Sequence, residues 1–112
     1  MTLHDKQVRF AHLLAYLLLR AEELGYQVTM GECWRSPEEA ARHGHPHSNH
    51  CLRLAVDLNL FRDGAFLTTT EAHRPLGTWW ESQDPWCRWG GRFLPPLEAD
   101  GNHYSMEHEG RS

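Results

Sequence analysis

Residues 54–61 read LAVDLNLF. Leucine or valine occupies every second position, which is the pattern of a β-strand with one face in the core. Asp57 falls on the opposite face. A buried carboxylate without a partner costs on the order of several kcal/mol, so an acid at this position needs a cation beside it. The stretch therefore predicts both a strand and a charged site next to that strand.

Shorter patterns on both sides predict the other elements. Apolar residues recur at three- and four-residue steps before Gly25, as in an amphipathic helix. Ser36 and Pro37 are typical of a helix start, and Asp63-Gly64 is typical of a hairpin turn. The predicted elements are, in chain order, helix 4–24, half-buried strand 26–30, helix 37–42, loop 43–49, strand 54–61, hairpin arm 66–67, a helix entered through 68–70 and ending near 82, irregular covering loop 84–100 and strand 103–108.

This order predicts an α+β fold, because few of its connections form regular βαβ units. We expect a small, mostly antiparallel sheet packed with helices. The chain has 112 residues, the length of one domain, so we expect a single catalytic domain over residues 1–112 and a monomer.

Composition excludes several classes of protein. The net charge is −4 and no basic stripe is present, which argues against a nucleic-acid partner. The apolar run 13–19 is too short to span a membrane, and the chain start lacks the features of a signal peptide. We therefore expect synthesis in the cytoplasm and no membrane insertion. The three cysteines form no CxxC pair and are expected to be free thiols, buried or partly buried.

His50 and Asp57 form the first candidate pair for a metal site. His50 ends a predicted loop, and Asp57 lies in the strand that follows. A shared metal would supply the cation that Asp57 requires. The alternative is an ion pair between Asp57 and Arg53 or Arg35, with His50 in solvent.

Asp100 and His103 form the second candidate pair. A histidine can ligate a metal while a carboxylate three residues earlier takes a proton from water. The alternative is a simple turn, which Asp-Gly-Asn favours by itself. His108 is a rival for His103, but residues five apart in a strand face opposite sides, so only one of them can face the site.

Together the two pairs predict a catalytic zinc site. Two imidazoles and one carboxylate, from His50, His103 and Asp57, leave one open position on tetrahedral zinc. Arg35 is then a candidate for holding a substrate carboxylate or a developing oxyanion, or else an exposed cation. Ser48 is a candidate substrate contact, with a plain turn residue as the alternative.

These residues resemble a known family. Residues 48–57, SNHCLRLAVD, resemble the Ser-x-His-x-x-Gly-x-Ala-x-Asp signature of the D-Ala-D-Ala carboxypeptidase and L-alanyl-D-glutamate endopeptidase family of zinc peptidases, which shares its fold with the hedgehog signalling domain. DGNH at 100–103 resembles that family's second motif, and CWRSPEE at 33–39 resembles its upstream segment. WGGRF at 89–93, followed by DGNHYS at 100–105, is similar to phage and prophage members.

The resemblance implies a zinc peptidase that hydrolyses peptidoglycan stem peptides, as a phage or prophage lysis enzyme acting on the cell wall after release. It implies that His50, Asp57 and His103 bind zinc, that Asp100 is the general base and that Arg35 stabilises charge on the substrate. The bond cleaved, L-Ala-D-Glu or D-Ala-D-Ala, stays open. Arg53 replaces the usual glycine, which either narrows the approach to the metal or points to solvent.

Two other functions fit parts of the pattern. One is a non-catalytic zinc-binding module on the same fold. The other is a histidine-rich metal carrier built on His43, His45, His47 and His50, whose exchangeable ligands would suit nickel or copper. A further question concerns four tryptophans, which either wall the cleft or pack in the core: Trp79, Trp80, Trp86 and Trp89.

Overall fold

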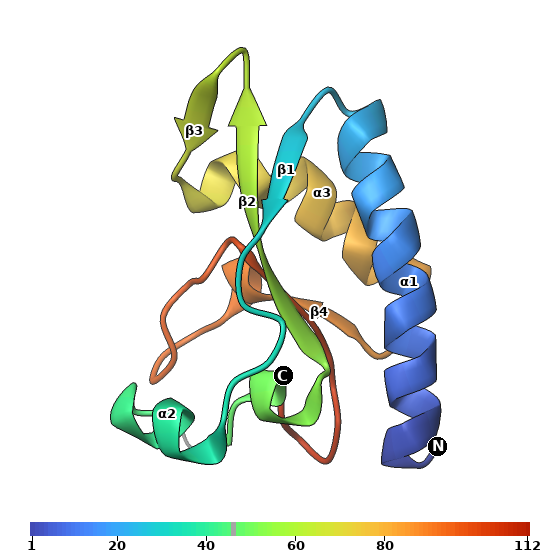
Figure 1. Cartoon of the computed structure of the whole chain (residues 1–112), viewed down its shortest axis with the longest axis vertical. Helices are drawn as coiled ribbons and strands as arrows, with labels where there is room; N and C mark the ends of the chain where they lie inside the picture. Colours follow the sequence, from blue (N-terminus) through green and yellow to red (C-terminus); the bar gives the residue numbers. More distant parts are fainter. Residues whose placement is uncertain (46) are drawn as a thin grey trace.

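The strand β2 (Ala55–Arg62) runs through the centre of the molecule and pairs with three other strands (Figure 1). The computed structural model describes residues 1–45 and 47–112; Pro46, in the predicted loop 43–49, lies outside the described residues. The sheet order is β1-β2-β5-β4, with β3 also paired to β2, and every pairing is antiparallel. The bounds of the added strands are Gln27–Met30 for β1, Ala65–Leu67 for β3, Cys87–Trp89 for β4 and His103–Met106 for β5.

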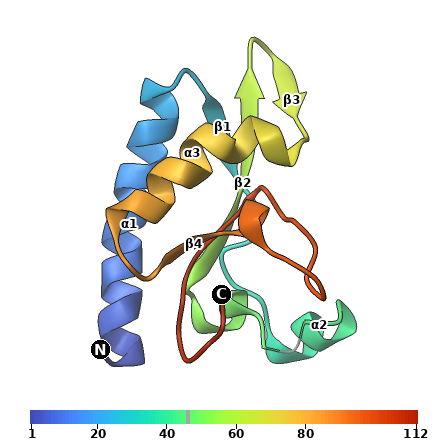
Figure 2. The same cartoon turned by 180° about the vertical axis from the view of Figure 1, so that it is seen from behind.

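Two long helices cover the sheet on its core side. Figure 2 shows α3 (Thr70–Gln83) crossing over the sheet with α1 (Leu3–Glu23) beside it. Each helix begins at a threonine whose hydroxyl accepts a backbone N–H, Thr2 for α1 and Thr69 for α3. The alternating residues of β2 enter the core, and Val56, Leu58 and Leu60 have no exposed surface. The predicted α+β fold with a small antiparallel sheet is therefore confirmed.

The end of the molecule that contains residues 36–52 is built from short elements. The helix α2 (Pro37–Arg42) lies at that end, capped by Ser36 as predicted. A single 3-10 turn, Asn49–Leu52, connects the loop after α2 to β2. The Asp63-Gly64 turn has positive φ at both residues and joins β2 to β3, so the predicted hairpin is present.

Three sequence-based expectations are wrong in detail. The predicted irregular loop 84–100 contains β4 and a 3-10 turn at Gly90–Arg92, because pairing with β5 orders a segment that lacks a local strand pattern. The strand β1 is mostly exposed instead of half-buried, since it lies at the edge of the sheet. Cys33 is exposed, whereas Cys51 is partly buried and Cys87 is buried; all three are free thiols.

The Trp89 side chain packs against α3 and forms a hydrogen bond with the segment that leads into β5. Its ring is 1 % exposed, and its Nε1 donates a hydrogen bond of 2.7 Å to the carbonyl of Gly101. A side chain at Gly77 or Gly91 would come closer than 3.0 Å to this ring, so both positions require glycine. The tryptophan and the two glycines therefore fix the position of the chain before His103.

His73 in α3 should make folding stability depend on pH. It is 3 % exposed, and its Nδ1 lies 2.8 Å from the Tyr104 hydroxyl. Burial lowers the pKa of His73 from 6.5 to about 4. Between these values the unfolded chain binds a proton that the folded chain does not, so stability falls as the pH drops from 6.5 to 4, by on the order of 3 kcal/mol in total.

Urea unfolding of the metal-free protein at pH 7 and pH 4.5 measures this effect. His73→Gln should lose less stability than wild type on acidification, because its side chain does not titrate. His12→Gln, an exposed control on α1, should behave as wild type. Equal losses in His73→Gln and wild type would show that burial of this imidazole does not set the pH dependence.

Candidate metal centre

Three different elements supply the residues of the candidate centre. His50 comes from the 3-10 turn, where the Ser48 hydroxyl accepts the His50 amide at 3.2 Å. Asp57 comes from β2 and His103 begins β5. The two strands pair in the register Asp57↔His103, so these residues lie directly opposite each other across the sheet. Neighbouring residues 56 and 104 point into the core, so the pair at 57 and 103 faces the other side.

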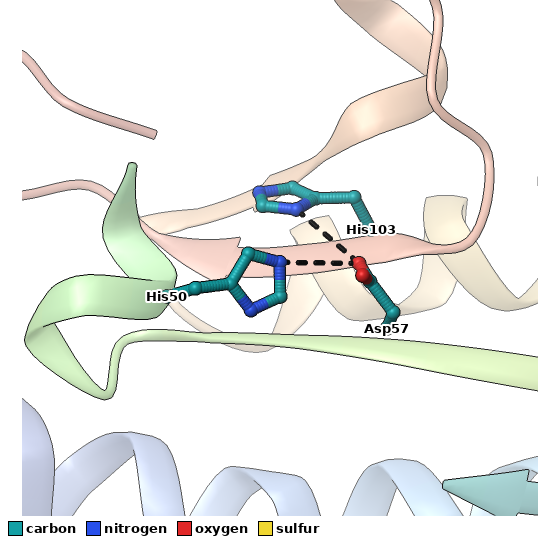
Figure 3. A group of neighbouring side chains, drawn as sticks. All are labelled: His50, Asp57 and His103. Atoms are coloured by element: carbon teal, nitrogen blue, oxygen red, sulfur yellow. Dashed lines mark ion pairs between the residues drawn. The ribbon is translucent and has the colours of Figure 1, made fainter. Parts of the chain in front are cut away.

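The three side chains converge on a small space (Figure 3). Asp57 Oδ1 lies 3.3 Å from His50 Nε2 and 3.6 Å from His103 Nδ1. One ligand atom from each residue lies within 4.8 Å of the other two. The two imidazole rings meet edge to face, with centroids 5.2 Å apart and planes at 74°. The predicted constellation of two imidazoles and one carboxylate is therefore present.

The chemistry of these atoms fits a divalent metal. Asp57 Oδ1 is buried and has no hydrogen-bond partner among the described residues, which is costly unless a cation binds there. Burial alone raises the pKa of Asp57, but His103 and His50 outweigh this and lower its pKa to about 2. The carboxylate is thus ionised at neutral pH. A donor set of two nitrogens and one anionic oxygen suits zinc with one position open.

Packing orients the two imidazoles. The ring nitrogens that face away from Asp57, His50 Nδ1 and His103 Nε2, are buried without a hydrogen-bond partner in the described part of the chain. Phe93 lies against the His103 ring with centroids 5.4 Å apart. Sequence reasoning did not select Phe93, although it stands in the quoted segment 89–93.

The alternative ion pair for Asp57 is not formed. Arg35 pairs with Glu32, and Arg53 lies over the Trp34 ring at 5.1 Å. Arg53 has φ 55° and ψ 35°, a left-handed conformation that favours glycine, which explains why a glycine suits this position. The Arg53 side chain is exposed and does not line the cavity described below, so it does not narrow the approach to the candidate centre.

A cavity of about 810 Å³ opens over the three side chains. The other candidate site residues, Asp100, Arg35 and Ser48, all line it. Sequence reasoning did not select Arg111, which also lines this cavity and carries no recognisable local motif.

Asp100 is held in the cavity by a turn. Its amide donates to the Gly90 carbonyl at 2.9 Å, and its carbonyl accepts the His103 amide at 3.1 Å. A side chain at Gly90 would collide with the Asp100 carbonyl, so this glycine permits the close approach. Crowding by protein atoms raises the pKa of Asp100 despite its exposure, and the charge of Asp57 adds to this while His103 and His50 oppose it. The turn interpretation and the site interpretation of Asp100 are therefore compatible.

Arg35 is largely buried and already paired. Its side chain is 12 % exposed, and its Nε donates to Glu32 at 3.0 Å. The Glu32 carboxylate raises the pKa of Arg35 and keeps its guanidinium charged. Its backbone amide donates to the His50 carbonyl at 3.3 Å, which ties residues 33–39 to the candidate centre.

The other histidines do not join the candidate ligand group. His45 and His47 line the cavity, and His43 pairs with Glu39 at 3.0 Å. Among the described residues, the potential metal ligands that cluster are His50, Asp57 and His103. His108 lies in a bridge with Arg111, so the choice of His103 over His108 agrees with the geometry.

The four tryptophans pack in or against the core. Trp80 and Trp89 are buried, and Trp79 and Trp86 pack on the core cluster. None of the four lines the cavity as far as the described residues define it. The interpretation of these residues as core is therefore confirmed over that of a cleft wall.

No described helix combines the length and hydropathy needed to cross a membrane.

Comparison with known proteins identifies the fold. No protein-family model matches the chain, and no curated protein matches it by sequence. Among solved structures, the L-Ala D-Glu endopeptidase ChiX of Serratia marcescens is similar, with a TM-score of 0.55 and 20 % sequence identity. The alignment covers 92 % of this chain and 77 % of that one. The chain thus shares the α+β fold of this L-Ala D-Glu endopeptidase and places a possible metal-binding triad, His50, Asp57 and His103, on it.

Proposed function

We propose that the chain is a single-domain zinc peptidase that hydrolyses peptide bonds in peptidoglycan stem peptides. One observation carries the proposal: the ligand-type atoms of His50, Asp57 and His103 converge at a cavity that Asp100 also lines. A metal site with an adjacent acid is the arrangement of hydrolytic zinc enzymes. The shared fold with an endopeptidase supports the same substrate class.

The residues of the chain would divide the work as follows. His50, Asp57 and His103 would hold zinc, which when bound supplies a Lewis acid that polarises the scissile carbonyl and acidifies water. Asp100 would accept a proton from the attacking water and return it to the leaving amine. Arg35, which Glu32 holds in place, would direct guanidinium N–H groups toward the carbonyl oxygen.

Three finer parts belong to the same proposal. Ser48 would contact the substrate as well as cap the turn that carries His50. The fold neighbour favours cleavage between L-Ala and D-Glu over a D,D-carboxypeptidase activity. We also propose a role in phage or prophage lysis, which rests on the quoted motif resemblance. Mass spectrometry of the fragments released from purified peptidoglycan identifies the bond.

The test of catalysis is the variant Asp100→Asn. It keeps the shape of the side chain and removes the proton acceptor, so peptidoglycan hydrolysis should fall at least about a hundredfold while bound zinc stays at the wild-type level. Release of soluble peptides and the zinc content of the purified protein measure the two properties. Asp63→Asn makes the same change in the β2–β3 turn, away from the cavity, and should keep full activity.

Two outcomes would favour the other functions. If wild-type protein binds zinc and releases no peptide, the chain is a zinc-binding module without catalysis. If joint replacement of His43, His45 and His47 removes most of the bound metal, the carrier hypothesis is correct. Under our proposal this triple variant keeps its zinc, because these residues lie outside the ligand group.

A further inference from the structure

Arg111 is a cation of the cavity wall that has no acidic partner among the described residues. Its Nε donates to the His47 carbonyl at 2.7 Å, and one Nη2 N–H donates to the Ser48 carbonyl at 3.2 Å. No carboxylate of residues 1–45 or 47–112 lies within 4.0 Å of its guanidinium. The side chain is therefore held in place by neutral acceptors and forms no ion pair with the described residues.

Its surroundings fix the position of this guanidinium. The Arg111 backbone forms a two-way bridge with His108, with both hydrogen bonds at 2.9 Å. The Asn49 side chain, which is fully buried, donates to the Arg111 carbonyl at 3.1 Å. Both ends of the residue are thus attached to the segment that carries His50, which makes the cation a preorganised part of the cavity.

Arg35 differs from Arg111 in this respect. Both line the cavity, but the Arg35 guanidinium is neutralised by Glu32, which it contacts through two nitrogens. A substrate carboxylate would have to displace Glu32 to pair with Arg35. At Arg111 the same carboxylate would meet a free charge and unused N–H groups in a geometry suited to two parallel hydrogen bonds. Of these two arginines, Arg111 is therefore the better placed to bind an anion.

We propose that Arg111 binds the free carboxylate of a glutamate next to the scissile bond and so determines substrate specificity. Glutamate has two carboxyl groups and a peptide chain uses one, so a free carboxylate always accompanies such a residue. This inference rests on the proposed function, because it takes the cavity as the substrate site. It gives Arg111 a specificity role and leaves the hydrolytic step to the residues named above.

The experiment compares two peptides that differ at one group. Both contain L-Ala-D-Glu, and the glutamate carries either a free carboxylate or a carboxamide. Wild-type zinc-loaded protein should cleave the carboxylate peptide with a kcat/KM about tenfold or more above that of the amide. Arg111→Gln should bring this ratio close to one through loss on the carboxylate peptide alone. Arg111→Lys, which keeps the charge, should restore most of the preference.

The control variant is Arg42→Gln. It removes a cation from α2, where Arg42 pairs with Glu39 and does not line the cavity, so the ratio should stay at the wild-type value. The inference is overturned if Arg111→Gln keeps the wild-type ratio or if wild type shows no preference. It is also overturned if Arg111→Gln loses rate equally on both peptides and Arg111→Lys does not recover it, because Arg111 would then only support the turn around His50.

A binding measurement separates this inference from the proposed function. Both peptides are titrated into zinc-loaded Asp100→Asn protein, with and without Arg111→Gln, and followed by NMR chemical shifts. Arg111-dependent preference for the carboxylate peptide without hydrolysis by wild type would sustain the inference and reject the proposed function. Hydrolysis by wild type without an Arg111-dependent preference would sustain the proposed function and reject the inference. Absence of binding by both peptides would reject the inference.

Discussion

Zinc affinity should fall by roughly a thousandfold in the variant Asp57→Asn, which corresponds to about 4 kcal/mol. The substitution keeps the size of the side chain but removes the one negative charge among the three proposed ligands. The two imidazoles would then share the metal with a neutral oxygen, which does not compensate its charge. The pKa of Asp57 is lowered to about 2, so its carboxylate is negatively charged at neutral pH and stays so in mildly acidic solution.

Competition with a chromophoric chelator measures the zinc dissociation constants of the two proteins. Thermal unfolding provides a second readout, since zinc should raise the Tm of wild type and leave that of Asp57→Asn nearly unchanged. Asp63→Asn is the matched control, because asparagine tolerates the positive φ of 51° at that turn. Wild-type affinity in Asp57→Asn would exclude this residue as a metal ligand, and the proposed function with it.

The second large effect concerns stability. Trp89→Ala should lower the free energy of unfolding by about 5 kcal/mol, at the upper end of the range for a buried tryptophan. The ring is 1 % exposed and lies between Gly77 and Gly91, which have no side chains to fill the space that its removal leaves. The variant also leaves the Gly101 carbonyl without the 2.7 Å hydrogen bond from the ring.

Urea unfolding of the metal-free proteins measures this loss. Trp34→Ala is the control, because Trp34 is 47 % exposed and its removal should cost about 1 kcal/mol or less. Trp89→Phe keeps an aromatic ring and should remain folded with a smaller loss, which keeps the comparison measurable if Trp89→Ala does not fold. Similar losses in Trp34→Ala and Trp89→Ala would show that the ring between the two glycines does not hold this part of the fold together.

The local elements were predictable from sequence because their signals lie within a few residues. The spacing of leucines in α1, the Ser36-Pro37 start of α2 and the Asp63-Gly64 hairpin all appear where they were predicted. The cost of burying an unpaired carboxylate also singles out Asp57 from the sequence alone. Alternation in β2 then placed it on the face opposite the core, where it lies.

The strand β4 was not predictable in this way. Cys87–Trp89 has no alternating pattern of its own and becomes a strand through hydrogen bonds to β5. The tryptophans and glycines around this strand indicate a loop by composition. In the structure, the Trp89 ring packs against the backbone of Gly77 and Gly91. Contacts between residues far apart in the chain outweighed local composition.

Sequence by itself determined which residue types could form a metal site, since the chemistry of histidine and aspartate is a property of each residue. Tertiary structure decided which of them meet: the register of β2 on β5 sets Asp57 opposite His103, and Arg35 turns to Glu32 instead of Asp57. It alone brings Arg111 beside residues more than sixty positions earlier. The physical reason is that charge compensation depends on distance in space, and spacing along the chain does not specify that distance.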